Sequence, residues 1–534
     1  MSTSEYLAQR SRGGRLTGPR VLDAARSIST DVWIVAALVV VATVIRVITI
    51  DTQSFWQDEA LTAYEAGLPF GAMLHTVVRV ETTPPLYFIL AWLWGHLFGV
   101  GEVSLRSISV VAGIALVPIA YLSTRELVSR WAGVLAAAFV TVNPFLIWYS
   151  QEARAYMLLA ALTGASFLWF ARARREPSRR NVGYWAVFSA LALMTHFFAG
   201  FLVAPEALWL LWVNRTGRVL GAVALVGVTQ VAMLPFAVAD TGHGVSWITA
   251  IPQLKRISNA IAEWGVSILY WRVTIAGGLV GGGILLVIAA LLIAFGGDRR
   301  TIEGARVAVP IAGFVVLAPL ALALVGQDYF LSRNIIPALI PLTAVIAAAC
   351  TAPRARLLGG ALAVALLVMF SVAAVTVQTS PALQRPNWRS VARALDPPTV
   401  PRAILASGGL TAQPLKIYMP GVDWTKSHTS EVRIREVDVV GAQKRMVLLP
   451  VFVKAPEGRL QPLFYTPSGS PVPRSVAPSG ARLISLFRVH NWTVARFALA
   501  HPMRISIDQL TTLAPEFFRR TPQSLLVFFQ PAGR

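Results

Sequence analysis

The sequence predicts an all-α polytopic membrane protein followed by a small extracytoplasmic α/β domain. Of the 534 residues, 55% are hydrophobic and only 14% are charged, which is more apolar than a soluble domain. Apolar runs that could cross a bilayer, at about 20 residues each, recur between residues 32 and 378. After Gln378 the chain becomes rich in proline and basic residues, with short apolar stretches typical of strands. These observations together predict the class.

Eleven of the apolar runs are predicted to span the membrane. They cover residues 32–50, 107–123, 131–149, 155–171, 183–199, 200–213, 219–236, 274–295, 307–325, 334–350 and 357–378. A further run, 84–100, follows Thr82-Thr83 with two prolines and is rich in Trp and Tyr. That composition suits an interfacial or re-entrant helix as well as a spanning one.

The distribution of basic residues decides how run 84–100 is treated. If it does not cross, six connections with 19 Lys and Arg fall on one side of the membrane. The loops on the other side hold 7 Lys and Arg but 10 Asp and Glu. Because an excess of Lys and Arg marks the cytoplasmic face, we predict that the N-terminus lies inside and that run 84–100 does not span.

This topology divides the chain into three parts. Residues 1–30 form a cytoplasmic tail, residues 31–379 a transmembrane domain with a first outer loop at 51–106, and residues 380–534 an extracytoplasmic domain at the plasma membrane. The last part holds 20 Lys and Arg against 8 Asp and Glu, so it could rest against anionic lipids. It carries no groove-reading motif, and we expect no nucleic-acid partner. We expect it to shape acceptor choice or to cover the site.

Short patterns predict the elements of this last part. Helices are expected over 388–395 and 507–513, and strands over 445–449, 482–487 and 524–529. Asn491-Trp492-Thr493 matches a glycosylation acceptor, which is a short and weak pattern.

The predicted outer loops collect ionisable and aromatic side chains from separate helices at one level of the membrane. Carboxylates there lose part of their hydration, so they usually face a polar space, a partner or a substrate. Three acids are candidate catalytic residues: Asp58, Glu59 and Glu152. Eight further residues are candidates for substrate binding: Tyr87, Arg154, Tyr156, His196, Lys255, Arg256, Tyr329 and Arg333.

Each candidate also has a structural interpretation. Asp58 could cap a short helix, with Glu59 favourable in its first turn. Glu152 and Arg154 could pair with each other or with a lipid headgroup. His196 could be an ordinary interfacial histidine, and Arg333 an anchor at a helix end. The convergence of several loops favours a site over these separate interpretations.

Several stretches resemble the integral-membrane glycosyltransferases of the GT-C fold. The stretches are Asp58-Glu59, Thr83-Pro84-Pro85-Leu86-Tyr87, residues 149–156 (YSQEARAY), Thr195-His196 and residues 332–341 (SRNIIPALIP), with Asn387-Trp388-Arg389 after the last span. The most similar branch is the group of protein mannosyltransferases and aminoarabinose transferases, in an actinobacterial version. The likeness covers residues 50–200 well and residues 327–395 more loosely.

The resemblance implies an inverting transfer of a sugar, such as mannose or an arabinose-like sugar, from a polyprenyl-phosphate donor. The acceptor would be a hydroxyl of a glycolipid, polysaccharide or protein on the outer face. Asp58 matches the position of the family's catalytic aspartate, and the family places juxtamembrane helices in the first outer loop. Some relatives have Lys or His where this chain has Thr83, so a basic contact to the donor phosphate must come from elsewhere.

The chemistry of such a donor suits the residues present. The leaving phosphate is an anion that arginine and lysine can hold without a metal. A carboxylate beside the acceptor hydroxyl can take its proton, which contributes typically about 10²–10⁴-fold in rate. We expect Asp58 to be this base, Glu152 to orient the acceptor or the neighbours of Asp58, and Arg333 with Lys255 or Arg256 to bind the phosphate.

Two alternatives stay open at this stage. Asp58 and Glu152 could share a Mg²⁺ or Mn²⁺ ion, because hard carboxylate oxygens suit these metals. The single cysteine, Cys350, offers no cysteine metal site and no disulfide framework. The protein could also be a transporter or flippase of a lipid-linked substrate, for which Arg46, Glu206 and Gln230 are the candidate midplane residues, although the chain shows no internal repeat.

Overall fold

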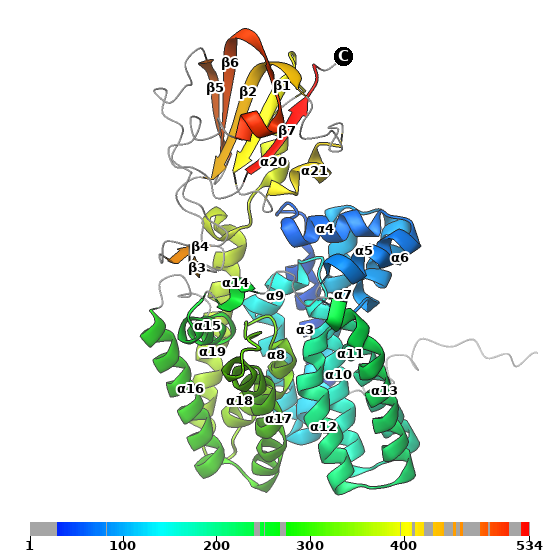
Figure 1. The fold of residues 1–534 in the computed structure, drawn as a ribbon. Helices are drawn as coiled ribbons and strands as arrows, with labels where there is room; N and C mark the ends of the chain where they lie inside the picture. The colour runs from blue at the N-terminus through cyan, green and yellow to red at the C-terminus, as the bar shows by residue number, and fades with distance from the viewer. Residues whose placement is uncertain are drawn as a thin grey trace, which may run out of the picture.

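The computed structural model consists of a bundle of membrane-type helices with a mixed α/β domain above it (Figure 1). The structure describes residues 29–81, 83–239, 246–249, 251–266, 274–395, 397–407, 412–420, 431–442, 452–454, 460–462, 481–489, 492–511 and 525–532. We call the end of the bundle that faces the α/β domain the upper end.

Each of the eleven predicted spans corresponds to a helix or a pair of helices. Seven described helices are long and apolar enough to cross a membrane, and an eighth span is the bent pair α8 and α9. The remaining predicted spans are shorter helices, α11, η1 with α12, and η4 with α18. The seven long helices are α3 (Thr30–Val47), α7 (Glu102–Leu127), α10 (Tyr156–Arg175), α13 (Gly217–Ala239), α16 (Ile275–Gly296), α17 (Arg299–Leu324) and α19 (Arg356–Thr379). The shorter ones are α8 (Arg130–Val142), α9 (Pro144–Ser150), α11 (Arg179–Thr195), η1 (Phe197–Ala199), α12 (Gly200–Val213), η4 (Ile336–Ala338) and α18 (Leu339–Cys350).

The break between α8 and α9 is held by an arginine from α3. The two helices are bent by 58° at Asn143-Pro144, and Pro144 has no N–H to donate to the carbonyl of Val140. Arg46 replaces that donor, with its Nη2 at 3.0 Å from the Val140 oxygen and its Nη1 at 3.2 Å from the Thr141 oxygen. At this depth an unpaired carbonyl would be costly, so the arginine has a structural task.

A glycine allows the arginine to approach. A Cβ atom added to Gly113 of α7 would lie 2.2 Å from the Ser150 hydroxyl and 3.1 Å from Arg46 Nε. Because Ser150 accepts a hydrogen bond from Arg46 Nε at 3.0 Å, a side chain at Gly113 would displace both partners. The close packing of α3, α7 and α9 therefore depends on this position.

Glu206 on α12 likewise joins helices. Its Oε2 accepts hydrogen bonds from Ser166 of α10 at 2.6 Å and from Trp185 of α11 at 3.0 Å. Arg46 and Glu206 were two of the three candidate midplane residues of a transporter. In this structure their contacts join helices to one another.

Run 84–100 forms a short helix in a group of three beside the upper end of the bundle (Figure 1). The group comprises α4 (Gln57–Ala66), α5 (Phe70–Val80) and α6 (Leu86–Phe98). Thirteen residues of helix reach about 20 Å, which is less than the hydrocarbon core of a bilayer. The three helices pack on each other through Ala63, Met73, Val77, Phe88 and Ala91, all buried. This agrees with the prediction that the run does not span.

The predicted outer loop at 237–273 also contributes short helices at the upper end. Its described parts are α14 (Ser246–Thr249), α15 (Gln253–Ile261) and a π-helical turn, η2 (Ala262–Val266). The ring of Trp264 contacts Phe145 of α9 at 5.9 Å between centroids, and its carbonyl accepts a hydrogen bond from Asn143 at 3.4 Å. The loop is thus anchored at the bend of the bundle.

The α/β domain contains a five-stranded sheet with the order β5-β6-β2-β1-β7, in which β1 and β2 are parallel and the other pairs antiparallel. The α20 and α21 helices cover one face through Trp388, Val391 and Leu415, which pack on Ile404 and Phe528. The elements are η5 (Pro381–Leu383), α20 (Trp388–Leu395), β1 (Arg402–Ser407), α21 (Leu415–Tyr418), β2 (Val432–Ala442), β3 (Phe452–Lys454), β4 (Leu460–Pro462), β5 (Ala481–Val489), β6 (Trp492–Ile505) and β7 (Leu525–Gln530).

Most of the expected elements of this domain are confirmed. The helix at 388–395 and the strands at 482–487 and 524–529 correspond to α20, β5 and β7, and residues 507–511 are helical. The expected strand at 445–449 and Asn491 of the glycosylation pattern lie outside the described residues.

Reporter fusions at the two ends of α7 test the orientation of the bundle. A reporter after Glu102, at the upper end, should be extracytoplasmic, and one after Arg130 should be cytoplasmic. The reason is that the connection at 124–130 belongs to the set of loops with the excess of Lys and Arg, which marks the cytoplasmic face. Alkaline phosphatase and green fluorescent protein fusions measure the two locations. A cytoplasmic Glu102 fusion would invert the assignment and place the candidate site on the wrong side.

Candidate active site

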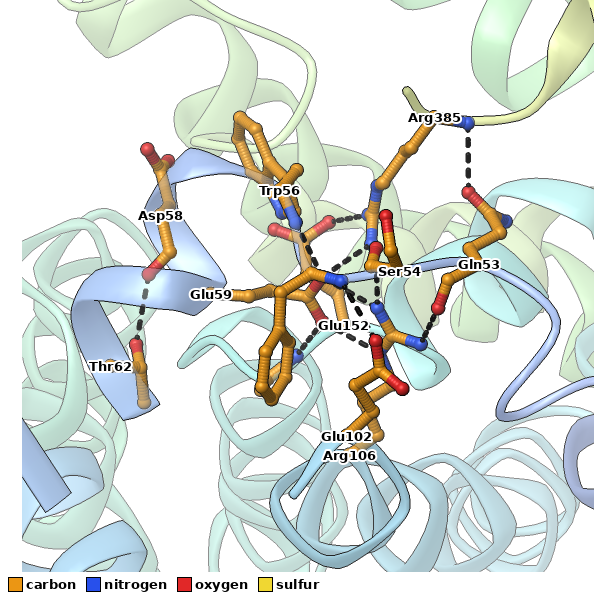
Figure 2. Close-up of polar contacts among 12 residues, drawn as sticks. Gln53, Ser54, Trp56, Asp58, Glu59, Thr62, Glu102, Arg106, Glu152 and Arg385 are labelled. Carbon is orange, nitrogen blue, oxygen red and sulfur yellow. Dashed lines mark hydrogen bonds and ion pairs between the residues drawn. The ribbon is translucent and has the colours of Figure 1, made fainter. Parts of the chain in front are cut away.

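The side chain of Glu59 is completely buried and lies at the centre of an ionic network at the upper end of the bundle (Figure 2). Arg106 of α7 donates from Nε and Nη2 to its two oxygens, each at 2.7 Å, and the backbone N–H of Ala153 donates at 2.9 Å. Burial raises the pKa of Glu59, but Arg106 and Arg385 outweigh it, so the net pKa is lowered. The same Arg106 donates to three backbone oxygens of the chain that leads into α4, those of Ile50, Gln53 and Ser54.

Arg385 connects Glu59 to Glu152. Its Nη1 lies 3.2 Å from Glu59 Oε2, and its Nη2 donates to Glu152 Oε2. The guanidinium lies over the rings of Trp56 and Trp148, at 5.4 and 4.6 Å from their centroids. Two carboxylates from different loops are therefore bound by one buried cation.

Glu152 is buried and only partly satisfied. Its Oε1 has no hydrogen-bond partner within the described residues. Burial raises its pKa to about 7, with further influence from Arg385, Glu59, Asp58 and Arg333. A carboxylate whose second oxygen has no hydrogen-bond partner can still accept a hydrogen bond from a substrate.

Asp58 is half-buried, and its side chain points away from the Glu59 network (Figure 2). It is the second residue of α4 and not its cap. The capping position is Trp56, whose N–H donates to Glu59 at 3.3 Å. The interpretation of Asp58 as a helix cap is therefore wrong. Its backbone oxygen accepts hydrogen bonds from Thr62 at 3.1 Å and from Arg154 at 3.4 Å, whereas its carboxylate accepts none from the described residues.

Arg154 is held by a second acid of the first predicted outer loop. Its Nη1 and Nη2 each lie 2.7 Å from an oxygen of Glu81, and its guanidinium lies over the ring of Phe88 at 5.5 Å. Glu81 and Asp58 are among the charges that raise the pKa of Arg154 against the effect of burial. Beside this pair, burial and the charge of Glu81 raise the pKa of Glu65 to about 9. Arg154 thus connects Glu81 to α4, through Thr62 and the backbone oxygen of Asp58. The interpretation that it pairs with Glu152 is wrong.

Arg333 lies in an aromatic group whose members are near enough to Asp58 for its charge to act on Arg333 and Tyr156. The Arg333 guanidinium lies over the ring of Tyr156 at 5.6 Å, and the Tyr156 ring contacts Tyr149 at 5.3 Å and His196 at 5.8 Å. His196 is buried, and its Nδ1 accepts a hydrogen bond from Phe198 N–H at 3.3 Å, which starts the η1 turn. The histidine therefore has a local structural task in this group.

The other predicted binding residues lie in separate contacts. Arg256 of α15 binds Asp328, with Nη1 at 2.6 Å from Oδ1, and donates to the Phe330 oxygen at 3.1 Å. Its neighbour Lys255 is half-buried. The hydroxyl of Tyr329 donates to Gln327 at 2.8 Å, and Tyr87 is buried in α6 against Phe88.

The structure thus groups Asp58, Glu152, Arg154, Tyr156 and Arg333, whose charges or rings influence one another. It adds Arg106 and Arg385, which sequence reasoning missed. A signal for Arg385 was present: the predicted outer loops carry 10 acids but 7 basic residues, so a cation from outside these loops was needed.

A shared cation between Asp58 and Glu152 gains no support from the donor set. Among the described residues, no group of three or more His, Cys, Asp or Glu side chains is placed to hold a metal ion. One oxygen of Glu152 is already bound by Arg385. A divalent ion therefore takes no part in the steps derived below.

The chain is similar to known membrane glycosyltransferases. A family model described as dolichyl-phosphate-mannose-protein mannosyltransferase matches residues 82–239, which include Glu152, Arg154, Tyr156 and His196. The match confirms, on this stretch, the resemblance that the motifs indicated. No curated protein matches the chain in sequence.

Three solved structures are similar to this one. ArnT from Cupriavidus metallidurans bound to undecaprenyl phosphate aligns with a TM-score of 0.48 and 15% identity over 88% of this chain and 98% of that one. The S. cerevisiae protein O-mannosyltransferase Pmt1-Pmt2 complex bound to the sugar donor aligns with a TM-score of 0.31 and 19% identity over 40% and 33%. The Archaeoglobus fulgidus oligosaccharyltransferase in the apo form aligns with a TM-score of 0.43 and 13% identity over 68% and 57%.

The neighbouring acids Asp58 and Glu59 should differ in their effect on stability. Glu59→Gln leaves Arg106 buried without its counter-charge and should lower the free energy of unfolding by about 3–5 kcal/mol. Asp58→Asn removes no internal hydrogen bond of the side chain and should change it by less than about 0.5 kcal/mol. Thermal unfolding of the two purified variants in the same detergent measures the difference. Similar losses in both would contradict the assignment of the network to Glu59.

Proposed function

We propose that the protein transfers a sugar from a polyprenyl-phosphate donor to an acceptor hydroxyl on the outer face of the plasma membrane. The observation that carries the proposal is the half-buried Asp58 carboxylate, which accepts no hydrogen bond from the described residues. Its charge acts on Arg154 and Arg333, and it lies near the buried Glu152 carboxylate, one oxygen of which has no hydrogen-bond partner among the described residues. The family match over residues 82–239 supports the same function.

In the proposed reaction Asp58 acts as the general base. It takes the proton of the acceptor hydroxyl while the acceptor oxygen forms a bond to the anomeric carbon. The bond from that carbon to the phosphate oxygen breaks, and polyprenyl phosphate leaves with the electron pair. The attack comes from the face opposite the phosphate, so the configuration at the anomeric carbon is inverted.

Arg333 is the residue we assign to the donor phosphate. It precedes η4 at the upper end, at a level that the phosphate of a membrane lipid can reach, and a guanidinium can hold two phosphate oxygens at once. The other arginine candidates are Arg154, which binds Glu81, and Arg256, which binds Asp328. Lys255 remains a candidate for a second contact to the phosphate.

The sugar and the acceptor follow from the resemblance only as classes. The donor sugar would be mannose or an arabinose-like sugar, and the acceptor a glycolipid, a polysaccharide or a protein. In the same proposal the N-terminus is cytoplasmic and the α/β domain extracytoplasmic.

Replacement of Asp58 tests the base. Asp58→Asn keeps the size of the side chain but cannot accept the proton, so transfer should fall by about 10²-fold or more while donor binding survives. The assay is the release of polyprenyl phosphate from labelled polyprenyl-phosphate mannose and arabinose by purified protein. Asp51→Asn, at an exposed position of the same loop, is the matched control and should be active. Near-normal turnover of folded Asp58→Asn would remove Asp58 from the mechanism.

Replacement of Arg333 tests the phosphate contact. Arg333→Ala should weaken donor binding, and Arg333→Lys should restore it only in part, because an ammonium cannot hold two oxygens in a fixed plane. Titration with a non-hydrolysable donor analogue measures the affinity. The exposed Arg79 of α5 provides the comparison. Weaker binding in Arg79→Ala than in Arg333→Ala would move the phosphate to the juxtamembrane helices.

A further inference from the structure

The segment that follows the last span is bound to the chain that leads into α4. We call residues 384–389 the arm. The backbone N–H of Arg385 donates to the side chain of Gln53 at 3.0 Å. The Ser54 hydroxyl accepts from Trp388 N–H at 2.9 Å and donates to the Pro386 oxygen at 2.8 Å. These bonds fix the arm within a few residues of Asp58.

A second set of contacts fixes the outer end of the arm. Arg389 binds Glu102 at the start of α7, and Tyr418 of α21 donates to the same Glu102 carboxylate. The Tyr418 hydroxyl also accepts the Phe55 N–H at 2.7 Å. The first predicted outer loop is therefore attached both to the arm, through Arg389, and to the α/β domain, through Tyr418.

Arg385 is the residue of the arm that reaches the candidate site. Its side chain is buried between two tryptophan rings and contacts the carboxylates of Glu59 and Glu152. Among the described residues it is the only hydrogen-bond donor to the Glu152 side chain. Arg106 already fixes the Glu59 carboxylate. The contact of Arg385 with Glu59 therefore fixes the Arg385 guanidinium, and its contact with Glu152 determines where the Glu152 carboxylate lies.

We propose that Arg385 is a positioning residue, which holds one oxygen of the buried Glu152 carboxylate and leaves the other to accept a hydrogen bond from the acceptor, so that the site is complete only when the arm is in place. This inference rests on the proposed function, in which Glu152 orients the acceptor hydroxyl toward Asp58. It gives residues 384–389, at the start of the α/β domain, a task in the transfer step, beyond acceptor choice.

The charges around Glu152 determine how the loss of Arg385 should change the pKa of the Glu152 carboxyl. Arg385 and Arg333 lower the pKa of Glu152, while burial and the acids Glu59 and Asp58 raise it. The groups that face Glu152 from the elements around it are Arg385 of the arm, Asp58 and Glu59 of α4, Tyr87 of α6, Tyr149 of α9, Tyr156 of α10 and Arg333 before η4. Without the nearest cation, protonation of Glu152 should occur at higher pH. An ionised Glu152 would then be available only under more alkaline conditions.

The test is the pH profile of transfer in Arg385→Gln. A neighbouring cation shifts a carboxyl pKa by about 1–3 units, so the acid limb of kcat/KM should move to higher pH by about one unit or more. The matched control is Arg389→Gln, which removes a cation of the same arm that binds Glu102 and not Glu152. In this control the midpoint should stay where it is in the unmodified protein. An unmoved midpoint in Arg385→Gln, or an equal shift in both variants, would overturn the inference.

A second variant covers the case in which Arg385→Gln does not fold. Arg385→Lys keeps the charge, but a single ammonium cannot hold two carboxylates in a fixed plane, so turnover should fall while the midpoint stays. Full turnover in this variant would overturn the positioning role.

Infrared titration separates the inference from the proposed function. The protonated carboxyl band of Glu152, assigned by its absence in Glu152→Gln, should titrate at higher pH in Arg385→Gln than in the unmodified protein. This measurement needs no substrate. An unmodified protein that is inactive on every donor would refute the proposed function, whereas a Glu152 band that does not move would refute the inference alone.

Discussion

The buried carboxylate of Glu59 is the interaction on which the upper end of the molecule depends. A carboxylate without water must be surrounded by donors, and here these come from α7, from the loop before α10 and from the arm. Three segments that are far apart in the chain are thereby brought to one point. The position of α4, and with it of Asp58, follows from how these donors are arranged.

The two adjacent acids of α4 have opposite surroundings because successive residues of a helix point about 100° apart. Glu59 meets Arg106, whereas Asp58 points away from that network, and its charge acts on Arg333 and Tyr156. The buried acid supplies rigidity and the half-buried one is open to a substrate. The buried Glu59 thus fixes the position of α4 and, with it, of Asp58, the proposed reactive group. Catalytic groups need to be kept within narrow limits of position.

The sequence predicted the helices and the level at which the polar residues meet, but not which charges pair. The apolar runs are long and regular, so each span was found, and the basic loops placed the short α6 outside the spanning set. Pairing was less visible because it depends on which helix faces which. Arg256 was predicted to bind the donor phosphate, but in the structure it binds Asp328. Glu152 binds Arg385 rather than Arg154, its near neighbour in the sequence. The starting point of α7 at Glu102, five residues before the predicted span, puts Arg106 within the helix that meets Glu59.

The order in which the chain is synthesised gives the arm a further consequence. Arg385 lies 326 residues after Glu59 and 233 residues after Glu152. Both acids therefore enter the membrane region well before their shared cation exists. Glu59 can pair with Arg106 in the meantime, whereas Glu152 waits for Arg385 until the last span has been inserted. A chain that stops before Arg385 leaves the buried Glu152 carboxylate without the hydrogen-bond donor that it has in the structure. In the proposed arrangement the site is therefore completed only after the last span, once the chain has reached Arg385.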